Sequence, residues 1–182
     1  AHAGARPEQG VSAATIASVA IAELEHGGWN GRIERTEGSG SANVGTLEGG
    51  TGTNVVMPRL HILAEARSHS PTFRHTIIDT WKAAFERAVS TIANSEGNRG
   101  HVTFSAGPTY EPFSLPEDAP VIRAVEEAAR RCHIDTRLVT NDGGMDANWI
   151  VAHGIPTVTL GVGRSNAHTP EERLDLGRFR RA

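Results

Sequence analysis

The order of secondary structure is decided by residues 61–92, HILAEARSHSPTFRHTIIDTWKAAFERAVSTI. We expect a strand from His61 to Arg67. Ser70-Pro71 then opens a helix, because serine can cap it and proline suits its first turn. Apolar residues recur at helical spacing along that helix: Phe73, Ile77, Trp81, Ala84, Phe85, Ala88 and Ile92. The stretch therefore predicts a strand leading into a helix with one buried face.

Similar patterns extend outward on both sides of this stretch. Upstream we expect a helix from Glu8 to Glu25, a Gly- and Ser-rich loop over 27–41 and a short strand from Asn43 to Leu47. Downstream, Val102 and Phe104 alternate with polar residues, which predicts a strand over 101–106. With one strand added before Ala1, the order becomes a βαββαβ sandwich of the ferredoxin-like type.

A domain boundary is expected in the stretch 108–116, which holds three prolines. We therefore expect domains over 1–112 and 113–182. The second is predicted to hold helices over 118–132 and 146–152 and strands over 136–140 and 156–161. Alternation of strand and helix indicates a parallel α/β layer, but these strands are too few for a free-standing sheet. The residues expected to face inward on the first of these helices are Val121, Val125, Ala128, Ala129 and Cys132.

Composition excludes several classes of protein. The 182 residues carry a net charge of −3, which gives no electrostatic reason to expect nucleic acid as a partner. No apolar run is long enough to span a membrane, and no signal peptide is visible, so we expect a cytoplasmic protein without a membrane partner. The single cysteine, Cys132, excludes a disulfide framework and a cysteine-based zinc site. Because the chain begins at Ala1 without methionine, we interpret it as a fragment.

Paired glycines stand out in the stretch Asn141-Asp-Gly-Gly-Met-Asp-Ala-Asn148. Gly143 and Gly144 would allow backbone N–H groups to approach a ligand closely. Asp146 is expected to cap the following helix, and Asn148 to lie in its first turn. A tight turn between strand and helix, without a ligand, explains the same pattern.

A histidine follows the next expected strand. Thr169, Pro170 and Glu172 form a capping-box pattern, so His168 should be held just before a helix. A neutral imidazole in such a place is a good metal ligand. The alternative is an ordinary polar surface residue.

Three further candidates lie in the first half of the chain. Asn54 follows the turn Gly49-Gly-Thr-Gly52, which lacks the Gly-Lys-Ser/Thr ending of a phosphate-binding loop. Arg67 could clasp a carboxylate with two hydrogen bonds or form a surface ion pair. His2 lies in a small-residue stretch before a helix, and its alternative is an exposed terminal histidine.

Taken in order, these segments resemble the two-zinc peptidase and deacylase family. The segments are Ala1–Gly4, Gly49–Val56, Ala64–Ser68, Gly143–Asn148, Gly154–Gly161 and His168–Glu172. Members of that family include tripeptidase T, glutamate carboxypeptidase, acetylornithine deacetylase and succinyl-diaminopimelate desuccinylase. The resemblance implies an α/β catalytic domain interrupted by a βαββαβ lid that also dimerises. Residues 1–112 would then be the lid without its first strand, and 113–182 the C-terminal part of the catalytic domain.

The resemblance also implies a mechanism for the complete protein. Two zinc ions, or other divalent metals, would activate a shared water, and a glutamate would act as general base. The family's His-x-Asp motif, bridging aspartate and Glu-Glu pair have no counterpart here, and only His168 matches a metal ligand. We therefore expect this chain by itself to be inactive.

Site residues carry over by similarity to the matching positions. His2 would reach across a homodimer to stabilise the oxyanion. Asn54 and Arg67 would hold the substrate's carboxylate. The substrate-binding set is completed by Gly143, Gly144, Asp146 and Asn148. The expected substrate is a short peptide, as for a tripeptidase. The alternatives are an N-acyl amino acid, cleaved by a deacylase, and a non-catalytic dimerisation module.

Overall fold

The computed structural model describes residues 1–141 and 143–181. The chain divides into two compact units, Ala1–Pro112 and Phe113–Ala182, and each is described by itself. Asp142, part of the paired-glycine stretch, lies outside the described residues. In the described part of the chain, no helix combines the length and apolar character that crossing a membrane requires.

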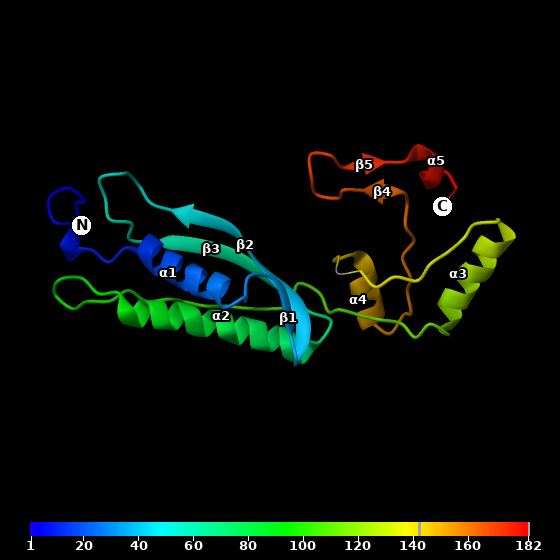
Figure 1. The fold of residues 1–182 in the computed structure, drawn as a ribbon, viewed down its shortest axis with the longest axis horizontal. Coiled ribbons are helices and arrows are strands. Elements are labelled where there is room, and N and C mark those ends of the chain that lie inside the picture. Colours follow the sequence, from blue (N-terminus) through cyan, green and yellow to red (C-terminus); the bar gives the residue numbers. More distant parts are fainter. Residues whose placement is uncertain (142, 182) are drawn as a thin grey trace. The chain divides into compact units, whose positions relative to one another are not determined.

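The first unit is a three-stranded antiparallel sheet with two helices on one face (Figure 1). Its elements are a 3-10 turn over Pro7–Gln9, α1 (Ala13–His26), β1 (Gly31–Arg35), β2 (Gly38–Gly49), β3 (Leu60–Arg67) and α2 (Pro71–Thr91). The strand order is β1-β2-β3, with a register shift in β2 between Val44 and Thr46. This antiparallel sheet with helices confirms the mixed α/β class.

The sequence predicted α2 and β3 well because both carry strong local signals. Ser70 accepts a hydrogen bond from the Phe73 N–H at 3.2 Å, so the expected N-cap is confirmed. The expected stripe on α2 is buried except at Ile92, which is half-buried. The same core takes residues from α1 and the sheet: Ile16, Ala17, Ala20, Leu24, Ile33 and Ala42.

Exposed charges also join the two helices. Arg87 on α2 donates to the Glu23 carboxylate on α1, and this hydrogen bond raises the pKa of Arg87. The upstream helix begins later than expected, at Ala13, where the Ser12 hydroxyl accepts the Thr15 N–H.

The prediction of a loop over 27–41 is wrong, because β1 and the beginning of β2 lie there. Ile33 is the single buried residue of β1, so the strand offers no alternating pattern to detect. Glycines in β2 also disguise it, although at least one is a packing requirement. A Cβ at Gly40 would lie 2.4 Å from the Arg67 carbonyl oxygen and 2.9 Å from Ile77 Cδ1.

The prediction of a strand over 101–106 is also wrong, since these residues belong to no strand of the structure. Val102 and Phe104 do pack against the core of the first unit. The alternation therefore signals one-sided burial, while the described residues provide no neighbouring strand for a hydrogen-bonded ladder.

The second unit has short elements and little core. They are α3 (Pro120–Arg131), α4 (Asp146–Ala152), β4 (Arg164–Ser165), β5 (Arg173–Leu174) and α5 (Leu176–Phe179). The strands expected over 136–140 and 156–161 are absent from the described residues, and Val139 in the first of them is 67% exposed. The prediction fails because, within the described residues, these two segments have no neighbouring strand with which to form a sheet.

The inward face expected for α3 needs correction as well. Ile122 is its buried residue, Val121 and Val125 are half-buried, and Ala128 and Cys132 are exposed. An apolar stripe is buried only where another element covers it.

Replacing Ile77 with alanine should lower the free energy of unfolding of the first unit by about 2–5 kcal/mol, because a fully buried side chain leaves a cavity. The measurement is urea unfolding followed by tryptophan fluorescence. A Trp149→Phe background would leave Trp29 and Trp81 as reporters of this unit. Val19→Ala on α1, where the side chain is 42% exposed, is the control and should change little. Equal losses for both variants would contradict the assigned core.

Candidate functional site

His2 lies in a tight turn at the beginning of the first unit. Its ring Nδ1 accepts the N–H groups of Gly4 and Ala5, each at 3.1 Å. The Arg6 N–H closes the turn by donating to the His2 carbonyl at 3.1 Å. The turn therefore fixes the orientation of an otherwise exposed imidazole.

The same turn is joined to the loop that carries Asn54. The Ala3 N–H donates to the Asn54 carbonyl at 2.8 Å, and the Val56 N–H to the Ala1 carbonyl at 3.0 Å. The Ala13 N–H, at the beginning of α1, donates to the Met57 carbonyl at 2.9 Å. The structure thus brings together two predicted site segments that lie about fifty residues apart in the sequence.

Gly10 allows this assembly to close. A Cβ there would lie 2.8 Å from Val56 Cγ1 and 3.1 Å from Ala1 Cβ. Real Cβ atoms essentially never approach another atom as closely as 2.8 Å, so a larger residue would displace Val56 and with it the Asn54 loop.

Arg67 ends β3 and makes a surface ion pair. Its Nη2 lies 2.8 Å from Glu65 Oε2, and its guanidinium carbon lies 6.0 Å from the centre of the Tyr110 ring. Tyr110, the chain's single tyrosine, gives no signal in the sequence because it lies in the proline-rich stretch without any periodic pattern. A second ion pair at 3.0 Å, between Arg74 and Glu111, holds the same stretch.

The paired-glycine segment ends in α4, and its cap differs from the expected one. Asp146 is the first residue of the helix and does not cap it. Instead Asn148, which is 5% exposed, accepts the Met145 N–H through Oδ1 at 3.0 Å. Upstream, the Gly143 N–H donates to Asn141 Oδ1 at 2.7 Å, so a side chain within the turn already occupies that backbone donor. Gly144 lies exposed between these two contacts.

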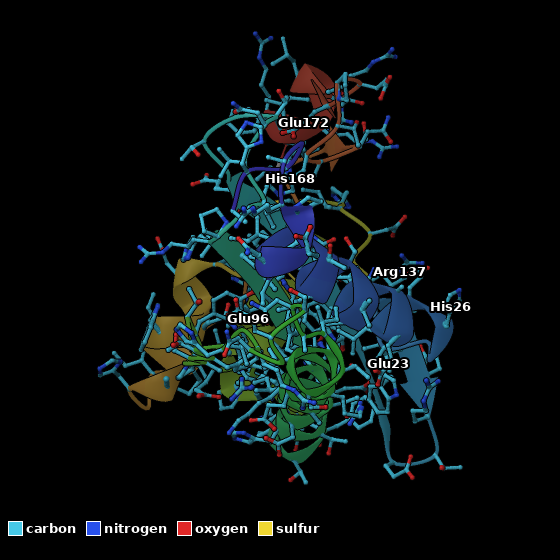
Figure 2. The ribbon with its side chains drawn as sticks, turned by 90° about the vertical axis from the view of Figure 1, so that its left-hand side faces the viewer. Glu23, His26, Glu96, Arg137, His168 and Glu172 are labelled. Atoms are coloured by element: carbon cyan, nitrogen blue, oxygen red, sulfur yellow. The ribbon has the colours of Figure 1, made fainter. Side chains whose placement is uncertain are left out.

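His168 does not precede a helix, which corrects the capping-box prediction. It lies in the turn of the β4–β5 hairpin with a φ of 64°, in the left-handed region. The Glu172 carboxylate accepts the His168 N–H at 2.7 Å, and the Thr169 hydroxyl accepts the Glu171 N–H at 3.2 Å. Figure 2 labels His168 and Glu172, the two residues that this hydrogen bond from backbone N–H to carboxylate joins. Glu172 therefore stabilises the backbone of the histidine and not a helix end.

The residues of this chain do not by themselves fit a metal site. Within residues 1–141 and 143–181, no group of three or more His, Cys, Asp or Glu side chains is placed to hold an ion. A protein zinc site needs three or four ligands, and His168 supplies one candidate. No chemical step through a metal follows from these residues.

Comparison with known proteins gives one family and several relatives. The model of the peptidase family M20/M25/M40 matches residues 7–182. The "uncharacterized protein YqjE" of Bacillus subtilis (strain 168) is 40% identical over 176 residues, or 97% of this chain and 44% of that protein. One chain of the p-aminobenzoyl-glutamate hydrolase of Escherichia coli (strain K12) is 31% identical over 133 residues, or 72% of this chain and 29% of that protein.

Two solved structures are similar across the whole chain. The aminopeptidase PepT from Bacillus cereus ATCC 10987 has a TM-score of 0.75 and 36% identity, covering 99% of this chain and 45% of that one. A tripeptidase from Staphylococcus aureus subsp. aureus Mu50 has a TM-score of 0.78 and 31% identity, covering 100% and 45%. The chain thus spans less than half the length of each relative.

Gly10→Ala should loosen the junction between the His2 turn and the Asn54 loop, because the new methyl group meets Val56. Overpacking of this kind costs about 1–3 kcal/mol. Amide hydrogen exchange at Ala3 and Val56 should become faster. Gly107→Ala is the matched control, since a Cβ there meets no atom within 4 Å. Unchanged exchange in Gly10→Ala would remove the role assigned to the glycine.

Asn148→Ala should weaken the beginning of α4, because the Met145 N–H loses its acceptor. The loss is about 0.5–1.5 kcal/mol, or up to about tenfold faster exchange of the Met145 amide. Asn148→Asp keeps an oxygen in the same place and adds a charge that suits a helix N-terminus, but burial of that charge has a cost, so it should preserve more of the protection than Asn148→Ala. The cap assignment fails if alanine and aspartate behave alike.

Proposed function

The chain belongs to the peptidase family M20/M25/M40, and from this membership we propose that it forms the lid and the C-terminal catalytic segment of a peptidase for short peptides. The observation that carries the proposal is the likeness to two solved structures, an aminopeptidase and a tripeptidase. Each of them covers at least 99% of this chain at 31% identity or more.

The proposed lid is residues 1–112, the first compact unit. Within it, Asn54 and Arg67 hold the carboxylate of the substrate. Arg67 suits this role because a guanidinium can form two parallel hydrogen bonds to a carboxylate. Its present partner, Glu65, holds the guanidinium in an ion pair that a substrate carboxylate would replace.

The proposed catalytic segment is residues 113–182. Gly143 and Gly144 line the substrate pocket, with Asp146 and Asn148 behind them in α4. The buried Asn148 suits a supporting role, since its hydrogen bond fixes the beginning of the helix. The described part of this segment adds no second histidine or carboxylate to His168 that would complete a metal site.

The family is generally metal-dependent, and we propose that His168 supplies one ligand to its metal, zinc being our first choice. The remaining ligands and the general base would come from residues outside this sequence. His2 would donate a hydrogen bond to the oxygen of the scissile carbonyl, across a homodimer formed by the lid.

One relative favours a second reaction at the same site. The name p-aminobenzoyl-glutamate hydrolase describes cleavage of the amide bond between an acyl group and an amino acid, and not cleavage of a tripeptide. Deacylation of N-acyl amino acids is therefore the second candidate.

The test compares the peptidase activity of two expressed proteins. One is the 182-residue chain, and the other is a longer protein that also includes the residues encoded before Ala1. We expect the longer protein to cleave tripeptides, a chelator to abolish cleavage, and the shorter chain to be inactive. His168→Asn tolerates the left-handed backbone and removes the imidazole. It should lower activity by at least about 100-fold, because even supporting residues of metal sites cost 10- to 100-fold.

A panel of acetyl- and succinyl-amino acids separates the two candidates. A deacylase would cleave these and spare tripeptides with a free amino terminus. A folded, metal-loaded longer protein that cleaves neither class would end the peptidase proposal.

A further inference from the structure

The hydrogen bonds around His2 determine which of its ring nitrogens carries the proton. Nδ1 accepts two backbone N–H groups, from Gly4 and Ala5, each at 3.1 Å. A ring nitrogen that accepts hydrogen bonds carries no hydrogen. In a neutral imidazole the proton then lies on the other nitrogen, so Nε2 is a donor.

The Nε2 side of the ring is available to a ligand. His2 is exposed, and Nε2 makes no hydrogen bond to any residue that the structure describes. The backbone behind the ring is held at both ends of the turn. An antiparallel bridge pairs His2 with Val55, and the Arg6 N–H donates to the His2 carbonyl.

We propose that the turn over residues 2–5 locks His2 in its Nε2–H tautomer and so makes it a neutral hydrogen-bond donor toward a ligand oxygen. The N–H groups of Gly4 and Ala5 are the positioning groups. The inference rests on the proposed function for the identity of the oxygen, which is the carbonyl of an amide substrate.

The chemistry of amide hydrolysis explains why a fixed tautomer of His2 would favour the reaction. A carbonyl oxygen gains negative charge as a tetrahedral intermediate forms, and a donor already aimed at it stabilises that charge. The other tautomer would present a lone pair to the same oxygen and repel it. Fixing the tautomer in the free protein removes this unproductive state before the substrate arrives.

Two substitutions distinguish the role of Nδ1, which accepts the backbone N–H groups, from the role of Nε2, which is the donor. In His2→Asn, the side-chain oxygen lies as far from Cβ as Nδ1 does, so it can still accept the Gly4 and Ala5 N–H groups. In His2→Gln, the polar atoms lie one bond farther out, near the place of Nε2. Asparagine therefore keeps the turn and loses the donor, whereas glutamine loses the turn.

Nitrogen-15 NMR of the histidine rings in the 182-residue chain tests the lock without requiring activity. We expect the neutral imidazole of His2 to show one unprotonated Nδ1 and one protonated Nε2. His75 on α2 is the control, because it is exposed and its ring makes no hydrogen bond within the described residues. Its two nitrogens should show averaged tautomers.

Amide exchange at Gly4 and Ala5 provides a second readout. It should rise by about 3- to 10-fold in His2→Gln, the equivalent of one lost hydrogen bond, and stay unchanged in His2→Asn. Averaged tautomers at His2, or equal exchange in both variants, would overturn the lock. A locked His2 in a longer protein without peptidase activity would instead remove the proposed function and leave the lock intact.

Discussion

Packing of α2 onto glycine positions of β2 is the constraint on which the first unit depends. A Cβ at Gly38 would lie 2.7 Å from the Phe73 ring, and one at Gly40 would lie 2.9 Å from Ile77 Cδ1. These two apolar anchors of the helix thus occupy space that side chains on the strand would fill. Close approach then lets α1 complete the layer, and the Trp81 indole N–H donates to the Trp29 carbonyl at 2.7 Å. The end of β3, and with it Arg67, is placed by this packing.

The second unit has no comparable constraint. Its buried apolar residues are Ala119, Ile122 and Ala147, while Leu160 and Ile155 are more than half exposed. Regular local structure is present where short-range hydrogen bonds stabilise it, as in α4 and the β4–β5 hairpin. The segments 136–140 and 156–161 have no strand to pair with in the described residues and form no strand themselves. This contrast agrees with a chain that spans less than half the length of its relatives.

Sequence patterns predicted the elements whose signals are local. The Ser70 cap and the stripe from Phe73 onward gave α2, and the paired glycines gave the beginning of α4. Elements defined by distant contacts were missed: β1 depends on Ile33 alone, and 101–106 has the alternation of a strand without a ladder. Within the candidate site, residue types pointed to His2 and His168, but their environments depend on backbone geometry. The Gly4 and Ala5 donors and the Glu172 acceptor follow from turn conformations that no periodicity encodes.

The junction of the His2 turn, the Asn54 loop and the beginning of α1 has a thermodynamic consequence for recognition. Its backbone hydrogen bonds already order residues 54–57 in the free protein. A ligand that docks there meets a loop whose conformational entropy was lost during folding. Association then avoids a backbone ordering cost of about 1–2 kcal/mol for each residue that would otherwise be fixed on binding. Binding at this junction should therefore carry a smaller entropic penalty than binding to a loop that orders around its ligand.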